Sequence, residues 1–436
     1  MTTTIALETL GCKINQYESS HFLETLEGAG CRLVSFRDPA DIYIVHSCSV
    51  TGSAAYQSRQ LLRRAQRARP GAKIVLVGCH AHIEPERIAS EHLATHILGN
   101  TEKTDLLTWL NQDGSLTAPC IAIKDPREAV SLTPLSVRRM HLGRTRAFLK
   151  IQDGCDAFCS YCIVPLTRGR SRSLLAPDVL TQLERFLTAG YIEVVLSGIH
   201  LGQWGKELEP GQTLAALIRT IGESLPPPRL RLSSLEPMEW TADLLSVLSA
   251  SPWICPHFHV PLQNGDADIL KAMGRPYTPD EYRDLIRELR LRFPDAAIGA
   301  DVMVGFPGES DRHFENTYEL VKDLPLTYLH VFPFSPRPGT LASSMSGRST
   351  GQELKKRSKA LRNLAAEKRL AFEHSFIGQN LEILVESEGL SGWSKGTSAN
   401  YLKVLFPALK ERTAPNLVRV KISRQTTNGL IGELLP

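Results

Sequence analysis

The chain has 436 residues, of which 42% are hydrophobic and 22% are charged, as in ordinary soluble globular proteins. This length is too great for one ordinary core and predicts two or three domains. No apolar run reaches the roughly 20 residues that span a bilayer. The formal net charge of +4 permits an anionic partner without requiring one.

The N-terminal residues and the cysteine content predict the compartment. The start of the chain lacks the basic and apolar regions of a signal peptide, so we expect a cytoplasmic protein with no membrane partner. Nine cysteines in a reducing compartment favour metal or redox chemistry over disulfides.

Residues 1–136 are predicted to form a parallel α/β domain. Apolar runs typical of buried strands occupy 5–7, 42–45 and 74–77, with helical patterns over 18–29 and 53–68 between them. A cysteine follows each run: Cys12, Cys48 and Cys79. Because the carboxyl ends of parallel strands meet at one edge of a sheet, these thiols can converge and hold a metal cluster. Alternatively, they are three buried free thiols, which are common in protein cores.

The second helical pattern is strongly basic. Six cations occur with no acid between residues 59 and 73: Arg59, Arg63, Arg64, Arg67, Arg69 and Lys73. Such a run is usually a solvated helix face. Six uncompensated charges beside a cluster site would also suit a phosphate backbone, so Arg63, Arg64 and Arg67 are candidate RNA contacts.

A domain of alternating strands and helices is predicted over residues 137–372, after a proline-containing extended linker at 111–137. Its strand patterns cover 148–151, 193–197, 230–234, 257–260, 297–304 and 328–334. Helical patterns cover 177–189, 213–224, 241–250, 266–273, 279–293 and 311–323. Six parallel units predict an open (β/α)6 partial barrel, whose functional residues lie on loops at the strand carboxyl ends.

The loop after the first of these strands carries Cys155, Cys159 and Cys162. Thiolates suit zinc or an iron–sulfur cluster, and both normally take four protein ligands. No fourth cysteine or histidine lies close by in the sequence. Three thiolates therefore favour a cluster with one open iron, with a zinc knot as the alternative.

Small and polar residues in the loops of this domain are candidates to line a cofactor pocket; alternatively, they form ordinary turns. They are Phe158, Tyr161, Ser197, Gly198, Ser234, Glu236, His259, Gln263 and Gly305. His200 is a further pocket candidate, and none of the thirteen histidines falls in a convincing ligand pair.

The C-terminal residues 373–436 are predicted to form a small antiparallel β-barrel, with strands at 381–385, 401–406 and 418–422. A basic amphipathic helix at 353–370, which includes Lys355 and Lys356, leads into it. Arg419 and Lys421 would share one exposed strand face. With Trp393 and Tyr401 for base stacking, the barrel is typical of an RNA-binding module, although a generic capping domain fits the same pattern.

These motifs closely resemble the radical S-adenosylmethionine (SAM) methylthiotransferase family along essentially the whole chain. The matching stretches are 9–19, 48–51, 77–79, 146–155, 168–173, 259–265 and 305–309, together with the three-cysteine loop. The resemblance implies an auxiliary 4Fe-4S cluster on Cys12, Cys48 and Cys79. It implies a second 4Fe-4S cluster, which cleaves SAM, on Cys155, Cys159 and Cys162, and a C-terminal TRAM barrel.

The sequence of residues 11–19 and 168–173 is most similar to that of the family branch that thiomethylates C2 of N6-threonylcarbamoyladenosine at position 37 of tRNA. The family mechanism implies two SAM molecules per methylthio group, a target base unstacked from the anticodon loop, and a reductant such as flavodoxin or ferredoxin. Other branches act on isopentenyladenosine in tRNA or on a ribosomal-protein aspartate. A non-catalytic metal-binding RNA-binding protein is the alternative of another class. His46, Ser47 and His80, which lie beside the auxiliary cysteines, differ from the residues usual in the family at these positions.

Overall fold

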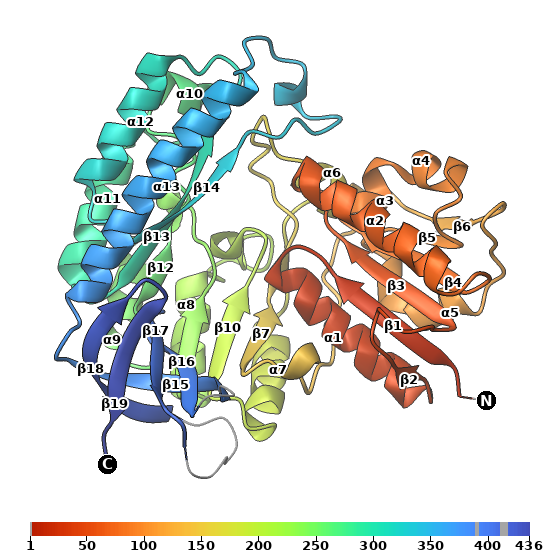
Figure 1. Cartoon of the computed structure of the whole chain (residues 1–436), viewed down its shortest axis with the longest axis horizontal. Helices are drawn as coiled ribbons and strands as arrows, with labels where there is room; N and C mark the ends of the chain where they lie inside the picture. The colour runs from red at the N-terminus through yellow and green to blue at the C-terminus, as the bar shows by residue number, and fades with distance from the viewer. Residues whose placement is uncertain (1, 389–391, 410–416) are drawn as a thin grey trace.

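The computed structural model describes residues 2–388, 392–409 and 417–436. Figure 1 shows an N-terminal α/β part, a central part of parallel strands and helices, and a C-terminal β-barrel below the central part. No helix in the described ranges combines the length and the apolar character that a membrane crossing needs.

The N-terminal part is built on one parallel six-stranded sheet in the order β2-β1-β3-β4-β5-β6. Its strands are β1 (Thr4–Thr9), β2 (Arg32–Leu33), β3 (Ile42–Ser47), β4 (Lys73–Gly78), β5 (His96–Leu98) and β6 (Cys120–Ala122). Its helices are α1 (Lys13–Gly28), α2 (Gly52–Ala68), α3 (Cys79–Ile83), α4 (Pro85–Ser90) and α5 (Leu106–Leu110). The three predicted strands and the two predicted helices are confirmed.

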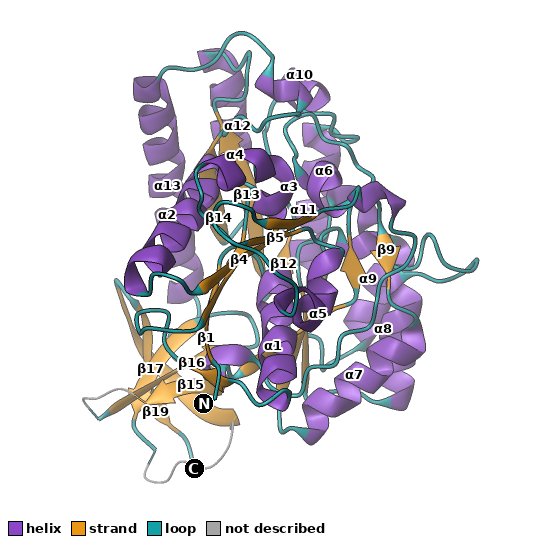
Figure 2. Cartoon of the chain, turned by 90° about the vertical axis from the view of Figure 1, so that its right-hand side faces the viewer, coloured by secondary structure: helices purple, strands orange, loops and turns teal. Residues whose placement is uncertain are grey.

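The two long helices cover opposite faces of this sheet (Figure 2). Alternate side chains of a strand point to opposite faces, so Ile44 packs with Leu26 of α1, whereas Tyr43 packs with Leu62 of α2. The expected 111–137 segment is not wholly a linker, because β6 lies within it and pairs with β5 at the sheet edge.

The central part is the predicted (β/α)6 partial barrel. Its strands are β7 (Arg146–Lys150), β10 (Glu193–Ser197), β11 (Arg229–Leu232), β12 (His257–His259), β13 (Ala297–Val304) and β14 (Tyr328–Pro333). Its helices are α6 (Val164–Arg168), α7 (Ala176–Thr188), α8 (Leu214–Ser224), α9 (Ala242–Ala250), α10 (Ala267–Ala272), α11 (Pro279–Arg292) and α12 (Asp311–Asp323). Two parallel sheets, β11-β10-β7 and β12-β13-β14, are joined where the Leu230 amide donates to Trp253 O at 2.8 Å.

A two-stranded antiparallel ladder of β8 (Gln152–Asp153) and β9 (Arg172–Ser173) holds the base of the cysteine loop. Gly154 has φ +74°, and an added Cβ would lie 1.8 Å from Arg170 O. Only glycine permits this close approach of two backbone segments.

The C-terminal part is a closed five-stranded barrel in the order β15-β16-β17-β19-β18. Its strands are β15 (Asn380–Glu388), β16 (Trp393–Ser398), β17 (Lys403–Pro407), β18 (Leu417–Thr426) and β19 (Gly429–Leu434), and α13 (Gly351–His374) leads into it. The prediction that a strand begins at Tyr401 is wrong, because this residue occupies the turn before β17 with φ +69°.

This barrel docks at the amino ends of the central strands. Arg231 of β11 donates to Ala399 O at 2.8 Å, and Arg229 donates to Glu382 O at 2.7 Å. The docking brings the 399–401 turn beneath the inner face of the partial barrel, close to His257.

Candidate active site

The loop of Cys155, Cys159 and Cys162 follows β7 and β8, at the carboxyl end of the first barrel strand. Backbone bonds secure it: the Cys155 amide donates to Gly169 O at 3.1 Å, and the Ser160 amide donates to Met273 O at 2.9 Å. Phe158 adopts φ +46° and exposes 54% of its surface. A non-glycine residue held in this strained region is typical of a functional loop.

Polar partners surround the three thiols of this loop. Cys155 Sγ lies 3.2 Å from His200 Nδ1, and Arg275 donates to Cys159 Sγ at 3.3 Å. Burial raises the pKa of Cys162 to about 12, and the charges of Cys159 and Cys155 add to this rise. Such thiols stay protonated until a metal replaces the proton.

Cys12, Cys48 and Cys79 follow the neighbouring strands β1, β3 and β4, and the structure brings them together as the topology predicts. Gly11 has φ +90°, and an added Cβ would lie 2.9 Å from Cys48 Sγ. Burial raises the pKa of Cys48 to about 11, with further contributions from Cys79 and Cys12.

The spacing of the thiols tests which metal group the trios fit. In neither trio, both of which lie within the described ranges, are all three sulfur atoms within 4.8 Å of one another. A single tetrahedral zinc ion with Zn–S bonds of about 2.3 Å would bring its sulfurs to within about 4 Å. The wider spacing fits a larger iron–sulfur cluster, for which thiolates are the usual ligands.

A buried charge network joins the two cysteine trios. Arg168 donates to Asp153 Oδ1 at 2.9 Å, beside the 155–162 loop, and to Asn15 Oδ1 at 2.6 Å, beside Cys12. Burial opposes the charge of Arg168, but Asp153, Cys79 and Glu18 raise its pKa above the ordinary value. The positive charge therefore lies between the two sets of thiols.

Glu18 of α1 is the acidic centre of this network. It accepts from Lys103 Nζ at 2.6 Å and from Lys150 Nζ at 2.7 Å, and Lys150 belongs to β7. Burial opposes its ionisation, but Lys103, Lys150 and Arg168 hold the pKa of Glu18 well below its usual range. Sequence reasoning missed these residues, because isolated Lys and Glu are ordinarily read as surface positions.

Of the residues that depart from the family sequence, His46 and Ser47 form side-chain hydrogen bonds beside the auxiliary trio, whereas neither ring nitrogen of His80 has a partner among the described residues. His46 Nδ1 lies 2.8 Å from Ser19 Oγ, and Ser47 Oγ donates to Val77 O at 2.6 Å. Burial lowers the pKa of His46 to about 4 and that of His80 to about 4, so both rings are neutral at pH 7.

The predicted cofactor residues other than Phe158 and His259 differ in what surrounds them. Tyr161 lies within the cysteine loop, and Glu236 lies near it, because it forms an ion pair with Arg275, which contacts Cys159. Gln263 has φ +64° and a buried Oε1 without a partner among the described residues. By contrast, Ser197 Oγ donates to Val195 O of its own strand, and Gly305 packs against Leu354. Gly198 and Ser234 lie in loops, where Gly198 approaches the Gln152 side chain and Ser234 is exposed.

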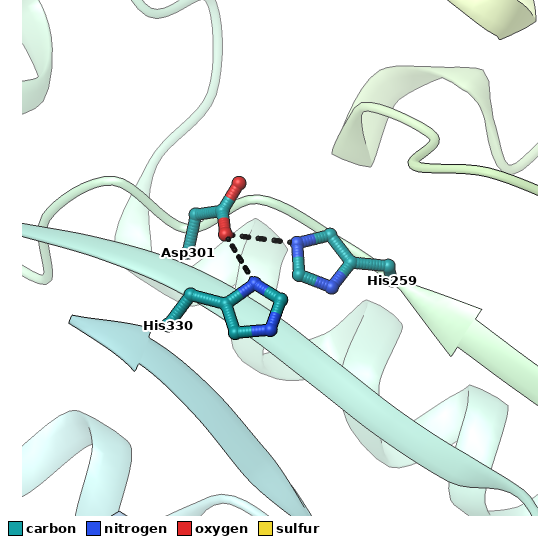
Figure 3. Close-up of side chains that lie close together, drawn as sticks. All are labelled: His259, Asp301 and His330. Carbon is teal, nitrogen blue, oxygen red and sulfur yellow. Dashed lines mark hydrogen bonds and ion pairs between the residues drawn. The ribbon is translucent and has the colours of Figure 1, made fainter. Parts of the chain in front are cut away.

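Two histidines that are far apart in the sequence meet on the inner face of the barrel (Figure 3). His259 Nε2 and His330 Nδ1 each lie 3.1 Å from Asp301 Oδ1. The expectation that no histidines pair as potential ligands is wrong here, because adjacent parallel strands bring 259, 301 and 330 together.

The candidate RNA-contacting cations are less free than the sequence suggests. Three of the six charges around α2 form ion pairs with acids from other segments: Arg59 with Glu84, Arg63 with Glu91, and Arg69 with Asp41. Arg64 and Arg67 are exposed. Lys355 and Lys356 are exposed on α13, and Arg419 and Lys421 are exposed on β18.

Comparisons with known families match both cysteine-bearing parts. Residues 4–99 match the model of uncharacterized protein family UPF0004, and residues 149–321 match that of the radical SAM superfamily. The chain is also similar in fold to the radical S-adenosylmethionine methyltransferase TsrM from Kitasatospora setae. That likeness has a TM-score of 0.56 and 16% identity, and covers 78% of this chain and 75% of the other.

Curated relatives extend the match over nearly the whole chain. A protein of Aquifex aeolicus named threonylcarbamoyladenosine tRNA methylthiotransferase MtaB is 34% identical over 96% of this chain and 100% of its own length. The MtaB protein of Bacillus subtilis is 34% identical over 96% and 93%. A tRNA-2-methylthio-N(6)-dimethylallyladenosine synthase of Moorella thermoacetica is 31% identical over 99% and 98%. The chain belongs to the radical SAM methylthiotransferase family.

Proposed function

We propose that this enzyme methylthiolates C2 of N6-threonylcarbamoyladenosine at position 37 of tRNA, in the cytoplasm. The observation that carries the proposal is the presence of both cysteine trios in a chain 34% identical, over almost its full length, to relatives named for that reaction. An unactivated C–H bond cannot be replaced by acid–base chemistry alone, which is why the reaction needs cofactors.

The proposed ligand sets are the two trios. Cys155, Cys159 and Cys162 would hold the 4Fe-4S cluster that binds SAM, and Cys12, Cys48 and Cys79 would hold the auxiliary 4Fe-4S cluster. When bound, these groups supply a 5′-deoxyadenosyl radical and the sulfur that is transferred. The protein would hold the two clusters at a fixed separation, because Arg168 bonds Asp153 beside one cysteine trio and Asn15 beside the other.

The residues around the 155–162 loop would position SAM. Phe158 and Tyr161 would shield it from water, and the Arg275–Glu236 pair would set the polar end of the pocket. We retain Ser197, Gly198, Ser234, His259, Gln263 and Gly305 as residues of the same proposed pocket. Of these, Gln263 has the most direct support, since its buried Oε1 is available for a donor on the cofactor.

Exposed cations would bind the tRNA backbone. The proposed contacts are Arg64, Arg67, Lys355, Lys356, Arg419 and Lys421, with Arg63 sharing its charge with Glu91. Phosphate contacts of this kind give affinity without sequence information. An anticodon loop presents its bases unstacked more readily than a duplex does. A small reductant protein such as flavodoxin or ferredoxin would supply the electron.

A second candidate substrate is N6-dimethylallyladenosine, because relatives named for that product are 31% identical over similar lengths. The polar inner face of the barrel favours the threonylcarbamoyl group instead. An apolar substituent would leave the buried Nδ1 of His257 unpaired, and such a loss is costly.

The proposal is tested by mass spectrometry of tRNA nucleosides from cells with and without the gene. Loss of 2-methylthio-N6-threonylcarbamoyladenosine, with return on complementation by the wild type but not by Cys159→Ala, supports it. Loss of the dimethylallyl product instead would transfer the assignment to the second candidate. Iron and sulfide analysis of protein purified without oxygen distinguishes both candidate enzymes from a non-catalytic zinc protein.

A further inference from the structure

The inner face of β12, β13 and β14 carries a row of polar side chains. Alternate residues of a strand share one face, so His257 and His259 of β12 lie beside Asp301 of β13 and His330 of β14. Asp301 and His330 are direct partners in the parallel register. The reaction proposed above uses neither Asp301 nor His330.

Three ligand atoms converge within this row (Figure 3). His259 Nε2 and His330 Nδ1 each lie 3.1 Å from the same oxygen, Asp301 Oδ1, and the three atoms all lie within 4.8 Å of one another. The ligand atoms of one metal ion, with bonds of about 2.0–2.2 Å, lie roughly 3–3.5 Å apart. One ion can therefore contact all three atoms after only small side-chain shifts.

A second set of contacts orients His259. Its other nitrogen, Nδ1, lies 3.2 Å from Tyr328 Oη, and the same hydroxyl lies 2.8 Å from His257 Nε2. When Tyr328 donates to His257, its oxygen accepts the proton of His259 Nδ1, and the lone pair of His259 Nε2 is free for an ion. Contacts of this kind fix the tautomer and the ring orientation of metal-binding histidines.

Gly299 of β13 makes these contacts possible. An added Cβ would lie 1.9 Å from Tyr328 Cζ, so only glycine lets the Tyr328 ring lie across β13 toward β12. The rings of Tyr328 and His257 are stacked, with their centroids 5.7 Å apart. The fold therefore holds Tyr328, and through it His259, in position before any ion binds.

The three ligand residues differ in exposure. The His259 side chain is 8% exposed, that of Asp301 27% and that of His330 64%, so the group is closed on one side and open to solvent on the other. Three protein ligands also leave at least one coordination position unfilled, which is typical of ions that bind a further ligand rather than of structural ions. The unfilled positions would lie on the open side.

We propose that His259, Asp301 and His330 form a binding site for one divalent metal ion, separate from the two cysteine trios. Two imidazoles and one carboxylate suit first-row ions such as Mn²⁺, Fe²⁺ and Zn²⁺. Oxygen atoms of water or of a bound substrate would fill the open positions. His259 would thus act in the proposed pocket through the ion, because both of its nitrogens are already engaged. The site does not depend on which nucleoside the enzyme modifies.

Hydrogen bonds from the two imidazoles to the carboxylate are the competing explanation for the same distances. Both nitrogens face Oδ1, although a carboxylate offers two oxygens to its donors. Convergence on one oxygen is the arrangement that a shared ion requires. Metal binding by the protein distinguishes the two explanations directly.

The test uses the enzyme with both 4Fe-4S clusters loaded and oxidised, a state in which they give no electron paramagnetic resonance signal. Mn²⁺ is the probe, because it prefers oxygen and imidazole ligands to thiolates. Loss of the six-line signal of free Mn²⁺ measures binding, and electron spin-echo modulation counts the coordinated nitrogen atoms. The wild type should bind one Mn²⁺ that has two nitrogen ligands.

Three variants make the test specific. His330→Ala removes a largely exposed ligand and should weaken binding by about a hundredfold, with one nitrogen coupling left, since loss of an outer contact alone costs about 10–100-fold. Tyr328→Phe removes only the hydroxyl that orients His259 and should weaken binding about tenfold. Asp268→Asn is the matched control, because Asp266, Asp268 and His313 form the other possible ligand group in the described ranges. It should leave the two-nitrogen signal unchanged.

An absence of saturable Mn²⁺ binding by the wild type would overturn the site and leave a hydrogen-bonded group. Binding without nitrogen couplings, or binding that His330→Ala does not weaken, would overturn it as well. The proposed function fails separately, because nucleoside analysis tests it and metal binding does not.

Discussion

Arg168 Nη2 donates to Asn15 Oδ1 at 2.6 Å, which joins the segment after Cys12 to the segment after Cys162. The same guanidinium bonds Asp153 through its other nitrogen. Because the buried Arg168 contacts the segments beside both cysteine trios, the packing of the folded chain fixes the distance between the trios. Arg168 also ties the N-terminal part to the barrel.

Replacing Arg168 should destabilise the protein strongly. Arg168→Met leaves the buried carboxylates of Asp153 and Glu18 short of a partner, which costs about 3–5 kcal/mol of unfolding free energy. Urea denaturation of the metal-free protein measures this loss. Arg67→Met, on the exposed face of α2, is the matched control and should stay within about 0.5 kcal/mol. A change in Arg168→Met as small as in the control would refute the network's structural role.

Acid should weaken the junction between the N-terminal part and the barrel. The pKa of Glu18 is depressed in the folded state, so its stabilisation is present above the unfolded value of about 4.3 and is lost as the pH falls toward the folded pKa. The thermal midpoint of the metal-free wild type should therefore decrease as the pH is lowered below 4.3. Glu18→Gln should start lower and fall less steeply between pH 4.3 and pH 3; parallel curves would contradict this.

The glycine before Cys12 should be essential for the auxiliary trio. Gly11→Ala introduces a Cβ atom 2.7 Å from Cys48 Cβ, and it places alanine at φ +90°, where a side chain is strained. The thiols of Cys12 and Cys48 must therefore move apart. We expect this variant to lose about half of the iron bound by the wild type. Gly28→Ala, where an added Cβ meets nothing within 4 Å, should retain all of it. Full iron content in both would show that Gly11 is dispensable.

The two cysteine trios should have different functions, which substitutions in each trio can distinguish. Cys159→Ala should abolish formation of 5′-deoxyadenosine from SAM, because the thiolate that it removes belongs to the SAM-cleaving set. Cys48→Ala should still form 5′-deoxyadenosine but no methylthiolated RNA. Chromatography of both products from one reaction provides the measurement, with Cys255→Ala, a buried cysteine outside both trios, as control. Methylthiolation by Cys48→Ala would end this division.

Local sequence patterns were sufficient to predict most of the fold. The predicted ranges 193–197, 297–304 and 311–323 coincide with β10, β13 and α12, because continuous apolar runs and helical periodicity mark them clearly. The short strands β2, β5 and β6, with two or three residues each, were not predicted, since too few residues carry a pattern.

The parts of the site that depend on long-range pairing could not be predicted. The acids that neutralise Arg59 and Arg63 lie 25 and 28 residues away and meet them only in the folded chain. Arg168 and Glu18 lie in stretches that resemble the family, but their contact depends on the packing of α1 against β7. The auxiliary trio was predictable because each of its thiols follows a strand whose neighbour is implied by parallel topology, and the 155–162 trio because its three cysteines share one loop.

The most direct test of the central claim is a reaction of the reduced, cluster-loaded enzyme with SAM and an anticodon stem-loop carrying N6-threonylcarbamoyladenosine at position 37. Mass spectrometry of the digested RNA should show that nucleoside heavier by one SCH2 unit, with 5′-deoxyadenosine formed alongside it. An unchanged nucleoside, together with modification of the dimethylallyladenosine stem-loop under the same conditions, would contradict the account.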